Sequence, residues 1–278
     1  MTDSRATPDA PITSLTNPRV KAAVRLRARR ERETTGLTIV DGAREILRAL
    51  DAGVRIETAF LAEDLIRTPD AEAAAERLRH RPTTIAVSPA VLAKVAFGER
   101  SDGVVAIVET PNADLADLRL PDDPLLVVLE GVEKPGNLGA VIRTADGAGA
   151  AAVIAADPLT DPFNPNAIRA SLGTIFALPV VAASTADTIA WLADRGIKVV
   201  ATIVDAPTAW TDADLTGPLA IALGNEADGL SAAWHDAAVT AISIPMRGIA
   251  DSLNVSTAAA VVLFEAVRQR GVTRDRGH

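Results

Sequence analysis

The chain contains no cysteine and few histidines or aromatic residues. The absence of cysteine among its 278 residues excludes disulfide bonds, thiolate metal ligands and a cysteine nucleophile. Its three histidines, His80, His235 and His278, are far apart in the sequence and show no metal-ligand spacing. Aromatic residues make up only 3% of the chain, so stacking on nucleic-acid bases is not indicated. We therefore expect no metal site, and we expect any RNA contact to involve phosphates and RNA shape.

Long apolar runs are missing as well. No stretch approaches the ~18 uncharged apolar residues that a membrane span requires. The polar first segment, MTDSRATPDAPITSLTNPR, lacks the apolar centre of a signal peptide. A hydrophobic content of 48% with 23% charged residues is typical of globular proteins. We expect a cytoplasmic protein with no membrane partner.

Basic charge is concentrated near the start of the chain, although the formal net charge is −8. Residues 17–32 contain seven basic residues and one acidic residue, a local balance of +6. Helical spacing groups arginines on one face of this segment and apolar residues on another, as in a solvated amphipathic helix. The alternative is a surface that neutralises RNA phosphates, for which we single out Arg25, Arg27, Arg29, Arg30 and Arg32.

The chain reads as two α/β domains joined by a linker. Residues 1–108 predict the smaller domain, with strands at Ile56–Ala62, Thr84–Val87 and Gly103–Val108. The segment Glu109–Pro124 is rich in proline and aspartate and predicts the linker. Residues 125–278 contain six short apolar runs separated by helical segments, which is the pattern of an open parallel sheet. These runs are Leu125–Leu129, Ala152–Ala155, Pro179–Ala182, Lys198–Val204, Leu219–Leu223 and Ala241–Pro245.

Common nucleotide-binding motifs do not explain the second domain. Gly147, Gly149 and Ala152 match G-x-G-x-x-A, but that motif needs a strand before it and a helix after it. The predicted order is reversed here, so these glycines indicate the end of a helix. Neither a P-loop nor a G-x-S-x-G elbow is present. These observations argue against a nucleotide-binding oxidoreductase.

Three other segments each combine a strand end, a loop and the start of a helix. Leu129–Asp146 contains PGN followed by a helix start, a place that favours an anion. Ile221–Ser231 contains GNEADG after a strand, and open α/β sheets bind ligands at the carboxyl ends of strands. Ile242–Glu265 crowds polar residues at the start of an apolar helix, and N-capping explains only one of them. Taken singly, each segment also fits an ordinary turn, cap or surface ion pair.

Taken together, the three segments resemble the SpoU branch of the SPOUT RNA methyltransferases. The resemblance covers about Leu125 to Arg270, and the spacer Ala227–Asp228 departs from the family's usual loop. A weaker resemblance links residues 12–46 to the substrate-binding domain of the ribosomal-RNA members. The residues that carry the main resemblance are Asn137, Gly139, Arg143, Thr144 and Ala145; Leu223, Gly224, Asn225, Glu226 and Gly229; and Ile244, Pro245, Met246, Ser252, Leu253, Asn254, Val255 and Ser256.

The resemblance implies a methyltransferase that uses S-adenosylmethionine, without a metal, on a ribose 2′-hydroxyl of RNA, first of all large-subunit ribosomal RNA. It also implies a C-terminal parallel-sheet domain with a trefoil knot, which forms a homodimer, behind a smaller RNA-binding α/β domain. The catalytic residues would be Arg143, Asn137, Glu226, Ser252 and Asn254. The cofactor-binding residues would be Leu223, Gly224, Ile244, Met246 and Leu253.

Arg143 is poorly suited to act as a general base. The resemblance matches it to a residue that is proposed to activate the 2′-hydroxyl from the partner protomer. A guanidinium with a pKa above ~12 is a poor general base at neutral pH. Orientation of the ribose and stabilisation of the developing alkoxide are easier for such a group.

Three alternatives remain open. The enzyme could act on tRNA, or it could modify a base nitrogen, although Arg143 together with Ser252 and Asn254 favours ribose. The chain could also be a non-catalytic RNA-binding assembly factor with the same fold. Such a protein need not have kept the five catalytic residues, which argues against this reading.

Overall fold

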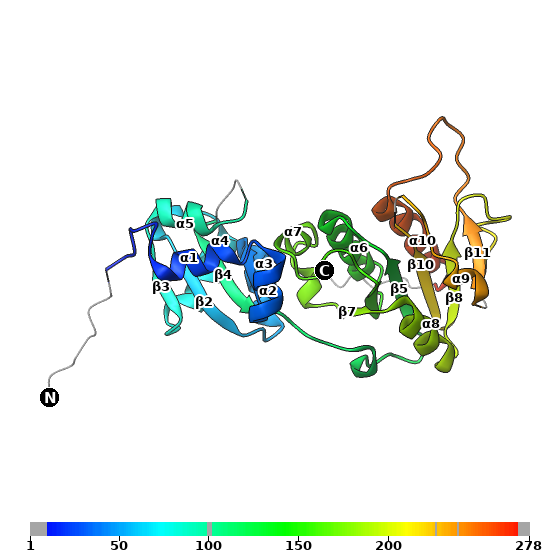
Figure 1. Ribbon diagram of the computed structural model, residues 1–278, viewed down its shortest axis with the longest axis horizontal. Coiled ribbons are helices and arrows are strands. Elements are labelled where there is room, and N and C mark those ends of the chain that lie inside the picture. Colours follow the sequence, from blue (N-terminus) through cyan, green and yellow to red (C-terminus); the bar gives the residue numbers. More distant parts are fainter. Residues whose placement is uncertain (1–9, 99–101, 226, 238, 272–278) are drawn as a thin grey trace. The chain divides into compact units, whose positions relative to one another are not determined.

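The chain divides into two units, Met1–Pro111 and Asn112–His278, at a point inside the predicted linker (Figure 1). The structure, a computed structural model, describes residues 10–98, 102–225, 227–237 and 239–271. Both units are α/β structures, as the sequence predicts. Among the described residues, every helix is too short or too polar to cross a membrane.

The first unit is built on a four-stranded mixed sheet with the order β1-β4-β2-β3. Strand β4 is antiparallel to β1 and β2, and β3 is parallel to β2. Three of the helices, α1, α4 and α5, begin with a proline directly after an asparagine, threonine or serine cap, which is a strong local start signal. The strands are β1 (Leu37–Asp41), β2 (Ile56–Leu61), β3 (Thr84–Ala86) and β4 (Val104–Glu109), and the helices are α1 (Pro18–Arg25), α2 (Arg29–Thr35), α3 (Ala43–Asp51), α4 (Pro69–Arg79) and α5 (Pro89–Val95), with a 3-10 turn η1 (Glu63–Leu65).

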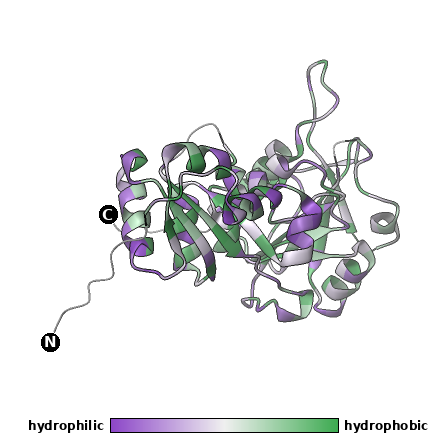
Figure 2. Ribbon diagram, turned by 60° about the vertical axis from the view of Figure 1, so that its left-hand side comes forward, coloured by the Kyte–Doolittle hydropathy of each residue, from purple (hydrophilic) through white to green (hydrophobic). Residues whose placement is uncertain are grey.

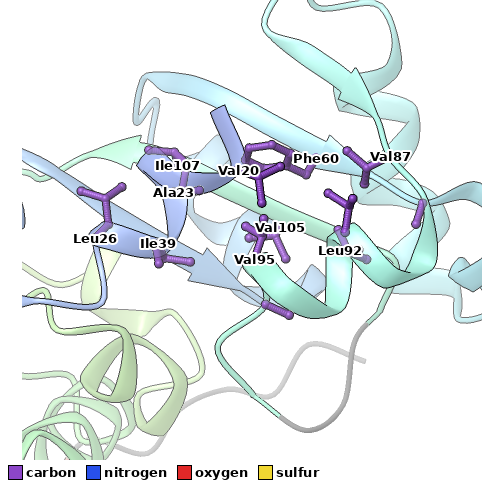
Figure 3. Packing of buried hydrophobic residues seen from close by; sticks show 13 residues of the cluster. Val20, Ala23, Leu26, Ile39, Phe60, Val87, Leu92, Val95, Val105 and Ile107 are labelled. Atoms are coloured by element: carbon purple, nitrogen blue, oxygen red, sulfur yellow. The ribbon is translucent and has the colours of Figure 1, made fainter. Parts of the chain in front are cut away.

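The first unit has a hydrophobic core between the α1–α5 helix pair and one face of its sheet (Figure 3). Helices α3 and α4 contact each other and the strands of the same sheet. The core includes Val20 and Leu26 of α1, Leu92 of α5, and Phe60 and Val105 of the sheet. Burial of these side chains fixes α1, which forms the first part of the basic segment of residues 17–32.

The basic segment is not the single helix that the spacing predicts. Helix α1 ends at Arg25, and α2 begins at Arg29. Arg32, which is only 5% exposed, donates from Nη1 to the carbonyl oxygens of Leu26 (2.8 Å) and Arg27 (2.9 Å). It therefore satisfies carbonyls that the end of α1 leaves without helical partners. The Arg32 side chain is buried in this role, which argues against the predicted contact of Arg32 with RNA.

The second unit is built on a seven-stranded, wholly parallel sheet with the order β7-β6-β5-β10-β8-β11-β9. The six predicted apolar runs correspond to strands, with ends that agree to within two residues, and β9 is an additional short strand. Figure 2 shows most of this sheet in the hydrophobic colour. The strands are β5 (Leu125–Glu130), β6 (Ala152–Ala156), β7 (Val180–Ala183), β8 (Lys198–Thr202), β9 (Thr208–Ala209), β10 (Leu219–Leu223) and β11 (Val239–Ser243).

The helices of the second unit form two groups. Helix α6 contacts both α7 and α10, whereas α8 contacts α9. Trp191 of α8 and Trp234 of α9 lie in a buried cluster that also receives Leu115, Leu118 and Leu120 from the predicted linker. Part of that segment therefore belongs structurally to the second unit. The helices are α6 (Pro135–Gly147), α7 (Pro165–Ala170), α8 (Thr185–Asp194), α9 (Ala233–Asp236) and α10 (Val255–Gln269), with 3-10 turns η2 (Leu115–Asp117) and η3 (Thr174–Phe176).

The strand order places a topological switch point at the centre of this sheet. Strands β5 and β10 are neighbours, paired from Leu125↔Leu219 to Leu129↔Leu223. The chain leaves β5 towards β6 on one side and leaves β10 towards β11 on the other side. The two connections diverge at the carboxyl ends of these strands, which is where open α/β sheets form ligand crevices. The trefoil knot remains a prediction.

Candidate active site

A cavity of about 220 Å³ lies at this switch point. The loop that leads into α6, the loop that follows β10 and the first residue of α10 all line it. These are the three segments that carry the resemblance, and the fold brings them to one place. The lining includes Glu130, Lys134 and Asn137, then Gly224 and Asn225, and finally Val255.

Asn137 and Asn254 meet beside the cavity although 117 residues separate them. Asn137 lies in the first turn of α6, and its Oδ1 accepts a hydrogen bond from Asn254 Nδ2 at 3.3 Å. Asn254 is the N-cap of α10, where its Oδ1 accepts from Ser256 N (2.9 Å) and Ser256 Oγ (2.6 Å). Each amide is thus oriented by the start of a helix, and the pair joins α6 to α10.

Arg143 is also on α6, but it does not face the same way as Asn137. Arg143 is six residues after Asn137, or about one and two-thirds helical turns, so the two side chains are about 120° apart around the axis. The Arg143 side chain is exposed and makes no ion pair with any described residue. It is not among the described residues that line the cavity of its own chain.

The loop after β10 is tightly folded on itself. A Cβ on Gly224 would overlap the backbone of Gly229 and Leu230, so only glycine fits at this crossing. Asn225 Oδ1 accepts from Ala227 N (2.8 Å) and Asp228 N (2.7 Å) and thereby holds the turn. The predicted cofactor residue Leu223 is buried at the end of β10. The predicted catalytic residue Glu226 lies outside the described residues.

The glycine of the first motif has a different role. Gly139 is inside α6, and a Cβ there would overlap Ala167 O and crowd Ala170 and Ser171 of α7. Close packing of α6 on α7 therefore requires glycine at this position. Its presence in the motif reflects contact between helices of the chain.

The loop between β11 and α10 carries the remaining predicted residues, and it projects away from the sheet (Figures 1 and 2). Ile244, Met246 and Leu253 are half-buried, and Ser252 is exposed. None of these four is among the described residues that line the cavity. The structure thus places Asn137, Gly224 and Asn254 together, whereas these four lie on the neighbouring loop.

Helix α10 is fixed at its far end by a set of polar contacts. Gln269 accepts from Leu215 N (2.9 Å) and donates to Ala213 O (3.1 Å), and Arg270 donates to the carbonyl oxygens of Pro124 and Gly217. Hydrogen bonds from Arg268 and Gln269 lower the pKa of the Glu265 carboxyl to about 2. These contacts hold the helix whose first residues border the cavity.

Glu130 is a lining residue that the sequence analysis did not predict. Glu130, which is 8% exposed, is the last residue of a strand that is otherwise entirely apolar. A charge at the end of a buried strand, directly before a motif loop, was a signal that the sequence did contain. Its Oε1 accepts from Thr185 Oγ1 (2.9 Å) and Ser231 Oγ (2.7 Å), and its Oε2 accepts from Ser231 N (2.7 Å).

The predicted RNA-binding arginines of the first unit differ in their surroundings. Arg27 donates to Lys94 O (3.1 Å) and Ala96 O (2.6 Å) at the end of α5, so part of its role is structural. Arg25 and Arg29 pair on the surface with Glu31 (3.0 Å) and Glu33 (2.6 Å), respectively. Three further cations in the segment are exposed and have no ion-pair partner among the described residues: Arg19, Lys21 and Arg30.

Among the residues that the structure describes, no group of three histidine, aspartate or glutamate side chains is arranged to hold a metal ion.

Two protein families match the chain. The SpoU rRNA Methylase family matches residues 124–264, which contain the cavity. The MRM3-like substrate binding domain matches residues 17–106, which contain the basic segment.

Individual relatives match both units. The chain is 34% identical over 260 residues to the 23S rRNA (uridine(2479)-2'-O)-methyltransferase of Streptomyces viridochromogenes, covering 87% of this chain and 86% of that protein. It is 40% identical over 183 residues to the 23S rRNA (guanosine-2'-O-)-methyltransferase RlmB of Ralstonia nicotianae, covering 64% of this chain and 74% of that protein. The crystal structure of an AdoMet-bound rRNA methyltransferase from Sinorhizobium meliloti superposes with a TM-score of 0.83 at 34% identity, covering 93% of this chain and 97% of that one.

Proposed function

Because the chain belongs to the SpoU rRNA methylase family, we propose that it transfers a methyl group from S-adenosylmethionine to a ribose 2′-hydroxyl of 23S ribosomal RNA. The observation that carries the proposal is the meeting of the three motifs at one cavity, at the carboxyl ends of β5 and β10. A ribosomal RNA substrate also leads us to propose a cytoplasmic location.

The cavity has chemistry that suits this cofactor. S-adenosylmethionine carries a carboxylate, an ammonium and a sulfonium, and Lys134 and Glu133 at the rim offer charges of both signs. Gly224 lines the cavity with backbone atoms alone, which can bind polar groups of the ligand. A volume of about 220 Å³ suits part of such a ligand. We propose that Leu223, Ile244, Met246 and Leu253 bind the remainder.

Methyl transfer depends mainly on alignment of the ribose hydroxyl with the methyl group. When bound, S-adenosylmethionine supplies an electrophilic methyl group on its sulfonium, so orientation of the ribose contributes much of the rate. In our proposal the linked amides of Asn137 and Asn254, together with Ser252 and Glu226, position the ribose. Arg143 stabilises the developing charge on the 2′-oxygen rather than removing its proton, because a guanidinium stays protonated.

We further propose that the site is completed in a homodimer. Arg143 does not line its own cavity, and Gly147, four residues later, lies on the same face of α6. Phe264 of α10 lies beside Gly147 and is 51% exposed, which is a high value for a large apolar side chain. An interface that covers Phe264 would also cover the Arg143 face and bring Arg143 to the partner's cavity.

The proposed activity has a direct test. The full chain is incubated with S-adenosylmethionine and 23S rRNA from cells that lack the gene, and every ribose is examined for 2′-O-methylation by its resistance to alkaline cleavage. We expect one nucleotide to become protected. The two relatives act on a uridine and a guanosine, so the readout must cover all four bases.

Other outcomes of this test would contradict the proposal in defined ways. Methylation of tRNA alone, or of a base nitrogen, would support the corresponding alternative enzyme. Tight RNA binding with no methyl transfer, under conditions in which the cofactor binds, would identify a non-catalytic assembly factor.

We propose that the exposed basic side chains of residues 17–32 bind RNA phosphates. The strongest contacts would be made by Arg19, Lys21 and Arg30. Replacing these three by Gln is expected to weaken RNA binding. The slope of log affinity against log salt should become shallower by roughly 0.7–0.9 for each phosphate that the protein no longer neutralises, because fewer counterions are released. Affinity for S-adenosylmethionine should not change, since the cavity is in the second unit.

A matched control is Arg67→Gln, which removes an exposed arginine of the same unit outside the basic segment. Its salt slope should stay at the wild-type value, and thermal melting should confirm that both variants are folded. An unchanged slope in the triple variant would mean that the basic segment is only a solvated surface.

A further inference from the structure

Glu130 is a buried carboxylate at the wall of the cavity. Strand β5 has the sequence LLVVLE, and all six of its residues are buried. A carboxylate in such surroundings is costly unless hydrogen bonds replace its lost hydration. Glu130 is 8% exposed and receives three hydrogen bonds from two residues, so its burial is compensated by specific partners.

These partners come from two distant segments. Ser231, 101 residues later, donates from both its backbone N and its hydroxyl, each at 2.7 Å. Thr185, the first residue of α8 and 55 residues later, donates from its hydroxyl at 2.9 Å. The Ser231 contacts therefore hold the loop after β10, whereas the Thr185 contact holds the start of a helix.

The loop that follows β10 is held at three residues, Gly224, Asn225 and Ser231, and Glu130 holds the last of them. It begins at Gly224, directly after β10, and its turn is held by the Asn225 side chain. It ends at Ser231, which Glu130 holds. Gly224, Asn225 and Ala227 of this loop line the cavity, so the position of Ser231 bears on the shape of the cavity wall.

We propose that Glu130 is a positioning residue, which keeps the loop of residues 224–231 in the shape that binds S-adenosylmethionine. The inference rests on the function proposed above. A carboxylate is suited to this task because hydrogen bonds to a charged acceptor are stronger than those between neutral groups. The competing view is that Glu130 only ties α8 to the sheet through Thr185.

Two single-hydroxyl variants separate these views. Ser231→Ala and Thr185→Val each remove one hydroxyl bond to the same Oε1 atom, so they should lower the thermal midpoint to a similar extent. We expect Ser231→Ala to weaken binding of S-adenosylmethionine by about tenfold, because the loop then has one hydrogen bond fewer to a charged group. Thr185→Val should stay within about twofold of wild type. Calorimetry on the full chain measures both affinities.

A second readout needs no cofactor. Hydrogen exchange of the amides at residues 227–231 in the free protein should be faster in Ser231→Ala and unchanged in Thr185→Val. Glu130→Gln should bind S-adenosylmethionine more weakly than wild type but better than Glu130→Ala, because its amide oxygen can accept from Ser231 N while its NH2 group donates to the two hydroxyls. Glu130→Ala removes all three bonds and should lose more affinity than Ser231→Ala.

Equal effects of Ser231→Ala and Thr185→Val on affinity and on exchange would overturn the inference. So would a folded Glu130→Ala protein with wild-type affinity, whereas an unfolded Glu130→Ala protein leaves the decision to the two hydroxyl variants. If the wild-type chain itself fails to bind S-adenosylmethionine, that result contradicts the proposed function. The exchange measurement then still decides whether Glu130 anchors the loop.

Discussion

Arg143→Ala is expected to lower methyl transfer by about 10²–10³-fold while leaving affinity for S-adenosylmethionine within a few fold. The side chain is exposed and has no ion-pair partner among the described residues, so its removal should not disturb the fold. It does not line its own cavity, so cofactor binding should be spared. Single-turnover rates with methyl-labelled cofactor, combined with calorimetry, give the two quantities separately.

Mixing variants tests whether Arg143 acts across a dimer. Arg143→Ala and Asn137→Ala should each be nearly inactive alone. If Arg143 serves the partner's cavity, a mixed dimer contains one site with both residues intact, and random mixing should restore about a quarter of the wild-type activity. If Arg143 serves its own cavity, both sites of every mixed dimer carry a substitution, and activity stays low.

Asp146→Asn is a suitable control, because Asp146 is an exposed charged residue on the same helix. It should retain both activity and affinity. Near-normal turnover of Arg143→Ala would show that the arginine is a surface residue and would remove it from the proposed mechanism. Loss of cofactor binding in that variant would instead assign Arg143 to the binding site.

The strands of the second unit could be predicted because a buried parallel strand is apolar along its whole length. β5, β6 and β10 are fully buried, and each appears in the sequence as a short apolar run, which in β5 ends before Glu130. The position of the cavity could be predicted for a related reason. The motif residues follow the carboxyl ends of these strands, and such ends share one edge of the sheet.

The break between α1 and α2 could not be predicted from helical periodicity. It is stabilised by contacts between a side chain and the backbone, and the spacing of apolar and charged residues does not show such contacts. Arg32 is charged and would be expected at the surface, yet its guanidinium donates hydrogen bonds to the carbonyl oxygens of Leu26 and Arg27. The hydrogen-bond partners of Glu130 could not be predicted for a similar reason. Its partners are 55 and 101 residues away, and only the folded chain brings them together.

The motif glycines show a further limit of the sequence. A glycine allows close approach of the backbone, but the sequence does not say what approaches. In the structure, Gly139 is approached by the backbone of α7, and Gly224 is approached by the backbone of Gly229. Both close approaches are made by the chain itself, even at a position that borders the proposed cofactor site.

Because the backbone of Gly229 lies against Gly224, we predict that even the small substitution Gly224→Ala will abolish tight cofactor binding. The added Cβ would overlap the Gly229 backbone, so the loop of residues 224–231 must move. Displacements of this kind cost about 1–3 kcal/mol, and at the upper end they correspond to about a 100-fold loss of affinity. Calorimetry with S-adenosylmethionine measures the loss. Gly136→Ala is the matched control, since a Cβ there meets no atom within 4 Å and the position is helical.

The cofactor-free protein distinguishes the two ways in which Gly224→Ala can act. If the methyl group collides with the chain, the free variant should already show a lower thermal midpoint and faster hydrogen exchange at residues 227–231, while Gly136→Ala shows neither. If the methyl group occupies only the space that the cofactor needs, the free variant should match wild type in both measurements and differ only on addition of S-adenosylmethionine. Wild-type affinity in the folded Gly224→Ala protein would contradict both accounts, and it would mean that the loop after β10 tolerates displacement without forming part of the binding site.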